Sequence, residues 1–177
     1  MIILTNDPSI TGWGYAVISQ SQSNQEVIKT AGCIKTAPEH QKKRIRKSDD
    51  LSRRISEINT NLITTITTFK VDYIVTEMPH GSQSASAMKM LGVVSGMLQT
   101  MSDCLDIPIE YYSEQDAKKF LLGKKSATKE DTIQAIDELY KVPWGKQLYK
   151  NEAIADAIAI YHVAQHESPT INYLKSR

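Results

Sequence analysis

Four carboxylates stand where a lone negative charge would be costly or conspicuous. Asp7 and Glu77 each end a short apolar run, and Asp156 lies inside the apolar stretch 153–159. Glu152 precedes Asp156 by four residues, and at about 100 degrees per residue this step places both on one helix face. Buried charges are normally paired or bound to a cation. With few bases nearby, these acids indicate a cation site, and ligation by oxygen alone fits magnesium or manganese rather than zinc.

Each of these acids also has an ordinary interpretation. Asp7 before Pro8 fits a turn aspartate, and Glu77 fits an exposed strand end. Glu152 fits an acidic residue in the first turn of a helix. Asp156 is the hardest to explain in this way, because its neighbours are apolar on both sides. Chance placement of all four together is a weaker explanation than a shared site.

The elements that must position these acids follow from hydrophobic patterning. Three short extended runs joined by turns predict an antiparallel meander, and the later apolar periods alternate between helix and strand. The expected strands are 2–5, 13–19, 26–34, 71–76 and 107–111, and the expected helices are 49–69, 85–98, 113–122, 127–140 and 150–165. The last helix is dense in Ala and Ile, which predicts burial on most sides. Residues 1–177 are therefore expected to form one mixed α/β domain.

Composition narrows the class of protein. The 177 residues are 41% hydrophobic and carry a net charge of +1, which excludes binding of nucleic acid by bulk charge but not by a local basic face. The cysteines, Cys33 and Cys104, are far apart, as is typical of a reduced intracellular protein. No apolar run approaches the roughly 18 residues of a membrane span, and no signal peptide is evident. A cytoplasmic location without membrane attachment is expected.

With these residues in view, the chain resembles the RuvC-type Holliday junction resolvases of the RNase H-like superfamily, and within them the phage-type branch. The resemblance covers nearly the whole chain. It rests on four signatures in the family's order: Asp7-Pro8-Ser9 with 11–15, 73–79 with 81–85, 117–123 with 126–130, and Glu152 with 155–159. It implies an RNase H-like fold, in which helices flank a five-stranded mixed sheet of three antiparallel strands followed by two parallel ones.

The resemblance implies a metal-binding and catalytic tetrad of Asp7, Glu77, Glu152 and Asp156, with Asp7 bridging two Mg²⁺ ions for which Mn²⁺ can substitute. The reaction implied is phosphodiester hydrolysis that leaves 5′-phosphate and 3′-hydroxyl ends, without a small-molecule cofactor. One departure concerns the last helix. Many relatives carry its first acid three residues before the second, where this chain has Ala153, so Glu152 is taken as the substitute.

The resemblance also implies contacts with four-way and other branched DNA. Lys118 and Lys129 match family lysines near the scissile phosphate. Further candidates for DNA contact are Lys124, Lys125, His80, Ser82 and the basic run 42–47. His80 occupies the loop position where relatives carry an aromatic wedge. Taken singly, the lysines also fit solvated helix charges, and His80 fits an ordinary polar loop residue.

Paired cuts in a two-fold symmetric junction imply a homodimer, with the long helix 49–69 and the helix after Glu77 as its surface by analogy with the family. Two alternatives remain. One is a structure-specific nucleic-acid-binding module without catalysis, and the other is an RNA-processing nuclease of the same fold. An actin-like kinase is disfavoured, because 177 residues leave no room for two such domains.

Overall fold

The chain folds around one five-stranded sheet. The structure, a computed structural model, describes residues 1–21, 26–39, 45–78, 84–124 and 128–175. The strands are β1 (Ile2–Asp7), β2 (Gly12–Gln20), β3 (Glu26–Lys35), β4 (Tyr73–Glu77) and β5 (Ile109–Tyr112). The helices within these ranges are α1 (Lys47–Phe69), α2 (Ala85–Leu105), α3 (Glu114–Leu122), α4 (Lys129–Leu139), α5 (Leu148–Glu167) and α6 (Pro169–Lys175). None of the helices described combines the length and apolar character that a bilayer crossing needs.

The strand order is β3-β2-β1-β4-β5. The pairs β1–β2 and β2–β3 are antiparallel, and the pairs β1–β4 and β4–β5 are parallel. This topology confirms the expected sheet of three antiparallel strands followed by two parallel ones. Because β1, β4 and β5 run in the same direction, their carboxyl ends lie at one edge of the sheet, where α/β proteins commonly bind ligands.

The first strand is longer than its apolar run. It continues to Asp7, two residues past the predicted end at Thr5. The polar residue Asn6 stays in the sheet because its side-chain oxygen accepts a hydrogen bond from the buried Trp13 Nε1 at 3.0 Å. Asp7 is consequently held in the β1–β2 ladder opposite Gly14, and its backbone is not part of a free turn.

The helices differ from the prediction mainly at their ends. α2 continues to Leu105, seven residues past the predicted end at Leu98. α1 begins at Lys47, two residues before the predicted start at Asp49, and keeps Asp49 in its first turn. α6 was not predicted, because seven residues are too few to show a helical period. It forms because the Ser168 hydroxyl accepts a hydrogen bond from the Ile171 amide at 3.0 Å and the Ile171 side chain is fully buried.

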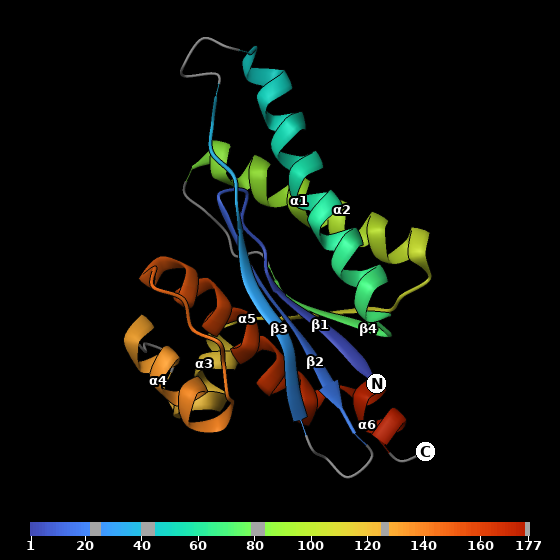
Figure 1. Ribbon diagram of the computed structural model, residues 1–177, viewed down its shortest axis with the longest axis vertical. Coiled ribbons are helices and arrows are strands. Elements are labelled where there is room, and N and C mark those ends of the chain that lie inside the picture. The colour runs from blue at the N-terminus through green and yellow to red at the C-terminus, as the bar shows by residue number, and fades with distance from the viewer. Residues whose placement is uncertain (22–25, 40–44, 79–83, 125–127, 176–177) are drawn as a thin grey trace.

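Helices cover both faces of the sheet. α1 and α2 lie on one face, and α5 with α3 and α4 lies on the other (Figure 1). The α1–α2 face packs around Trp13, Leu62 and Leu98. The opposite face packs around α5, most of whose side chains are buried, as its composition predicted.

The α5 helix approaches the sheet closely at two points near Asp156. A Cβ added at Gly14 would lie 2.0 Å from the backbone oxygen of Ala153, so β2 and α5 meet backbone to backbone there. The buried Thr5 hydroxyl donates a hydrogen bond to the backbone oxygen of Ala157. Together these contacts fix α5 along β1 and β2, which brings Asp156 to the end of β1.

We expect Gly14→Ala to lower the free energy of unfolding by about 2–4 kcal/mol, because the added methyl group forces β2 and α5 apart. Chemical denaturation monitored by circular dichroism measures the change. Gly12→Ala is the matched control on the same strand, since its Cβ would make only an ordinary 3.6 Å contact with the Cys33 Sγ. Equal stability of the two variants would contradict the close approach.

Candidate active site

Two of the predicted acids end adjacent parallel strands. Asn6 of β1 pairs with Thr76 of β4 in the last step of the register, so Asp7 and Glu77 follow side by side. Their carboxyl groups share a hydrogen bond. Asp156 of α5 lies on the same sheet face, and its charge acts on both of them. The structure thus brings together three acids that are distant in the sequence.

Crowding perturbs the titration of all three. Desolvation and then the charges of Glu77 and Asp156 raise the pKa of Asp7 well above its usual range. Desolvation, followed by the charges of Glu114 and Asp156, raises the pKa of Glu77 to about 7. Desolvation likewise raises the pKa of Asp156 to about 6, although Lys118 partly opposes the shift. Without a cation, these groups cannot all ionise at neutral pH without substantial electrostatic cost.

Glu114 is a fourth acid at this edge that the sequence analysis did not single out. It opens α3 two residues after β5 ends at Tyr112. Its charge raises the pKa of Asp7, Glu77 and Asp156. The signal in the sequence was its place directly after a strand parallel to β1 and β4, because the carboxyl ends of parallel strands meet at one edge.

Glu152 lies to the side of this group. Its carboxylate forms an ion pair of 2.7 Å with Lys129, and its charge contributes to the raised pKa of Asp156. The position one residue later, Ala153, is packed against Gly14. Glu152 is therefore a neighbour of Asp156, held by a lysine, rather than a member of the Asp7–Glu77 pair.

The predicted DNA-contacting lysines divide in two. Lys118 forms an ion pair with Glu114, and its charge acts on Glu77 and Asp156. Lys118 and Lys129, which pairs with Glu152, thus place two positive charges beside the acids. Lys124 instead pairs with Asp131 at 3.1 Å and is mostly exposed. The other candidates, Lys125, His80, Ser82 and residues 42–44, lie outside the described residues.

Basic groups also lie on the other side of Asp7. Gly14 pairs with both Asp7 and Cys33, so these three form one row across β1, β2 and β3. The charges of Lys150 and Lys35 act on the Cys33 thiol. Lys35 Nζ donates a hydrogen bond to the Tyr149 hydroxyl at 3.1 Å. Neither lysine stands out in the sequence, because only the pairing of β3 with β2 and the packing of α5 bring them to this side of the sheet.

The chemistry of the acids suits a divalent cation. Within the described ranges, no three His, Cys, Asp or Glu side chains stand at the spacing of a formed metal site. The donors nonetheless fit: Asp7 and Glu77 are close enough to share a hydrogen bond, and Asp156 adds a third carboxylate. Hard oxygen donors of this kind are those that Mg²⁺ and Mn²⁺ prefer.

Comparison with known proteins shows that the chain is similar to the members of one family. The family model described as "Crossover junction endodeoxyribonuclease RuvC" matches residues 3–163. The protein of that name from Shewanella frigidimarina is 30% identical over 164 residues, covering 93% of this chain and 88% of the relative. The corresponding protein from Citrobacter koseri is 30% identical over 165 residues, covering 93% and 89% respectively.

A solved structure has the same fold. Thermus thermophilus RuvC, in complex with a Holliday junction substrate, superposes with a TM-score of 0.71 at 18% identity. The match covers 92% of this chain and 94% of that one. The RNase H-like arrangement of sheet and helices is thereby confirmed.

The raised pKa of Glu77 predicts the pH dependence of stability in the metal-free protein. Its folded-state pKa of about 7 lies above the ordinary value of 4.5, so the ionised group destabilises the fold above pH 7 and the penalty fades as pH falls toward 4.5. Glu77→Gln mimics the protonated form. We expect it to raise the free energy of unfolding by about 1–3 kcal/mol at pH 8 and to give no gain near pH 4.5.

Urea unfolding in EDTA at several pH values measures this difference. The comparison between variant and wild type is needed because burial lowers the pKa of His162 to about 4, which has the opposite effect on wild-type stability as pH falls below 6.5. Glu138→Gln on the exposed surface of α4 is the control and should shift stability equally at every pH. A Glu77→Gln protein no more stable than wild type at pH 8 would contradict the crowding of the acids.

Proposed function

The chain belongs to the RuvC family of crossover junction endodeoxyribonucleases, and from that premise we propose that it resolves four-way DNA junctions by paired, symmetric, metal-dependent nicks. The observation that carries the proposal is the meeting of Asp7, Glu77 and Asp156 at the carboxyl edge of the sheet, with lysines beside them. Other branched DNA is a secondary substrate in this proposal.

The three carboxylates would hold the ions that the reaction needs. Bound divalent ions, two Mg²⁺ in this proposal with Mn²⁺ as a substitute, would activate the attacking water and stabilise the leaving 3′ oxygen. Metal binding would displace the proton that Asp7 and Glu77 share, and the positive charge of the ions would then offset the repulsion between the two ionised carboxylates. Glu152 would serve as the fourth ligand after exchanging Lys129 for an ion. The products would carry 5′-phosphate and 3′-hydroxyl ends.

The lysines would hold the DNA backbone at this edge. Lys118 and Lys129 each neutralise an acid in the free protein, and both are within electrostatic reach of Asp156. When a phosphate arrives, either ammonium group can exchange its carboxylate partner for a phosphate oxygen. Such contacts supply affinity and position the strand without reading sequence. Lys124 is further away in this scheme and would contact a flanking phosphate.

The assembly in this proposal is a homodimer of single nuclease domains, each spanning residues 1–177. The outer side of α1 and α2 supports the dimer, because it exposes the apolar Ile63, Met88 and Leu105. A cavity of about 410 Å³ lies there, lined by α1 and α2 side chains including Met97. A two-fold axis through this surface would give two sites for the two cuts. The bacterial origin of the relatives supports a location in the cytoplasm of a bacterial or phage-infected cell, which is part of this proposal.

Asp7→Asn should abolish cleavage, by at least about 1,000-fold, and leave junction binding intact or tighter, because it removes a metal ligand and a charge that repels phosphate. Cleavage of a labelled four-way junction in Mg²⁺ on denaturing gels measures the first effect, and gel shift without Mg²⁺ measures the second. Linear duplex and EDTA are the controls. A wild-type protein that binds junctions but never cuts them in Mg²⁺ or Mn²⁺ would favour the non-catalytic binding module.

Lys118→Met should slow cleavage or weaken junction binding about 10-fold or more, because the Lys118 ammonium group lies beside the acids. Lys119→Met is the matched control, since Lys119 instead lines a separate cavity with Asp116, Phe120 and Glu167. Rates under single-turnover conditions and binding constants separate the two effects. Equal loss in both variants would argue for general charge attraction and against a specific contact by Lys118.

A further inference from the structure

The turn that follows Asp7 contains few hydrogen bonds between its own residues. Residues 8–11 join β1 to β2, and Pro8 has no amide hydrogen to donate. Within the turn, the Thr11 amide donates to the Ser9 hydroxyl at 3.3 Å. Beside it lies a cavity of about 440 Å³ lined by Ile10, among others. The hydrogen bonds inside the turn and the packing around it are therefore not enough to fix its position.

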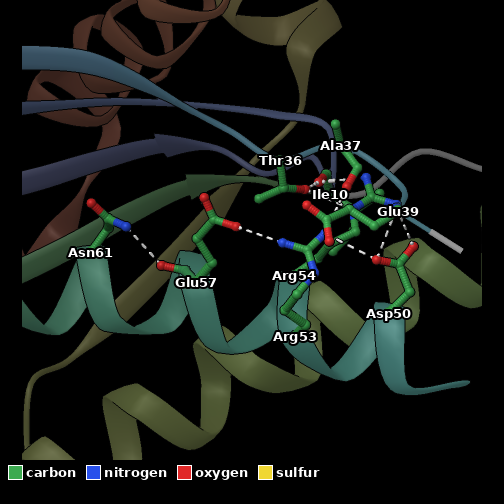
Figure 2. Close-up of polar contacts among 9 residues, drawn as sticks. All are labelled: Ile10, Thr36, Ala37, Glu39, Asp50, Arg53, Arg54, Glu57 and Asn61. Carbon is green, nitrogen blue, oxygen red and sulfur yellow. Dashed lines mark hydrogen bonds and ion pairs between the residues drawn. The ribbon is translucent and has the colours of Figure 1, made fainter. Parts of the chain in front are cut away.

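An arginine from the long helix holds this turn from the opposite face of the sheet to α5. The Arg54 Nη2 donates a hydrogen bond to the backbone oxygen of Ile10 at 2.9 Å, and its Nε donates to the Thr36 hydroxyl at 2.7 Å. The Thr36 hydroxyl in turn donates to the same Ile10 oxygen, and its amide donates to the Thr11 oxygen at 3.3 Å. Figure 2 shows Arg54 reaching from α1 to Thr36 and Ile10.

A second set of contacts on α1 holds the segment that follows β3. Asp50, only 2% exposed, accepts hydrogen bonds from the Glu39 amide at 3.2 Å and from Arg53 at 3.0 Å. Arg53 also donates to the Ala37 oxygen at 2.7 Å. These contacts tie the segment after β3 to α1 (Figure 2). Arg53 thus holds the strand exit, whereas Arg54 reaches the turn.

Burial of the Arg54 guanidinium costs free energy that packing alone does not require. It is 9% exposed, and taking a guanidinium out of water costs several kcal/mol unless its hydrogen bonds are well made. An apolar side chain would fill the same volume without that cost. The planar guanidinium, however, can bind two oxygens at once in a fixed geometry, and here it joins Ile10 of the turn to Thr36.

We propose that Arg54 is a positioning residue for DNA cleavage: by holding the Ile10 oxygen it fixes the turn behind Asp7 and so the placement of the Asp7 carboxylate. This inference rests on the proposed function, in which Asp7 is a metal ligand. Arg54 touches neither the DNA nor the ions in this scheme. Its loss should lower the rate of the chemical step while junction binding is maintained.

Arg54→Met tests the proposal, with the neighbouring Arg53→Met as the matched control. We expect Arg54→Met to reduce the single-turnover cleavage rate about 10- to 100-fold, the scale of a 1 Å misplacement, and to raise the Mg²⁺ concentration for half-maximal rate. Its junction dissociation constant without Mg²⁺ should stay within about twofold of wild type. Arg53→Met should cleave within about threefold of wild type. An Arg54→Met rate equal to that of Arg53→Met overturns the proposal.

Amide hydrogen exchange in the metal-free protein gives a readout that does not depend on activity. Exchange in residues 9–12 should become at least about 10-fold faster in Arg54→Met and unchanged in Arg53→Met, since Arg54 contacts the turn whereas Arg53 contacts Ala37. Unchanged exchange in Arg54→Met overturns the proposal. If Arg54→Met does not fold, Thr36→Val replaces it, because that change removes the bridging hydroxyl but keeps the shape. A wild-type protein that does not cut junctions overturns the proposed function. The exchange rates of residues 9–12 then still show whether Arg54 restrains the turn.

Discussion

The partial burial of three mutually repelling carboxylates at the end of β1 is the constraint on which the rest of the structure depends. Asp7, Glu77 and Asp156 each lose water, and the charge of Asp156 raises the free energy of ionising Asp7 and Glu77. A protein selected only for stability would place apolar residues there. The fold instead holds the acids together and sets Lys118 and Lys129 beside them as partial compensation.

Holding charges against their repulsion requires a rigid frame on every side. On one face, the backbone contact between Gly14 and Ala153 and the hydrogen bond from Thr5 fix α5 and hence Asp156. Within the sheet, the parallel pairing of β1 with β4 places Asp7 next to Glu77. On the opposite face, Arg54 secures the turn that follows Asp7. Preorganisation of this kind is what two-metal hydrolysis needs, because the ligands must stand ready before substrate and ions arrive.

The ion pairs of the free protein are consistent with a site that exchanges partners. Lys129 holds Glu152 and Lys118 holds Glu114, so each lysine occupies an acid while no phosphate is present. In the proposed reaction these acids are released as the lysines turn to DNA. The cations Lys35 and Lys150 on the far side of Gly14 extend positive charge beyond the acids. A DNA strand crossing this edge would therefore meet lysines before and after the carboxylates.

The sequence by itself was enough to predict the strands of the sheet and to select Asp7, Glu77 and Asp156 as candidate site residues. Alternation in the first third predicted the antiparallel meander, and the later apolar periods predicted two further strands, because these patterns depend on residues close in the chain. The apolar setting of Asp156 marked it as unusual for the same reason. The parallel direction of those two strands was implied by the family resemblance. Strand ends were less accurate, since the pairing of Asn6 with Trp13 that extends β1 is a contact between strands.

Only the tertiary structure decided which charged groups meet. Lys35 and Lys150 belong to segments far from Asp7 in the sequence, and nothing in their local pattern distinguishes them from surface residues. Glu114 follows a predicted strand, but only the parallel pairing of that strand brings it near Asp7. The place of Glu152 beside Lys129, and the reach of Arg54 to Ile10, likewise depend on how α5 and α1 pack on the sheet. The physical reason is that electrostatic interactions act over a few ångströms of space, and local sequence patterns do not specify which distant segments share that space.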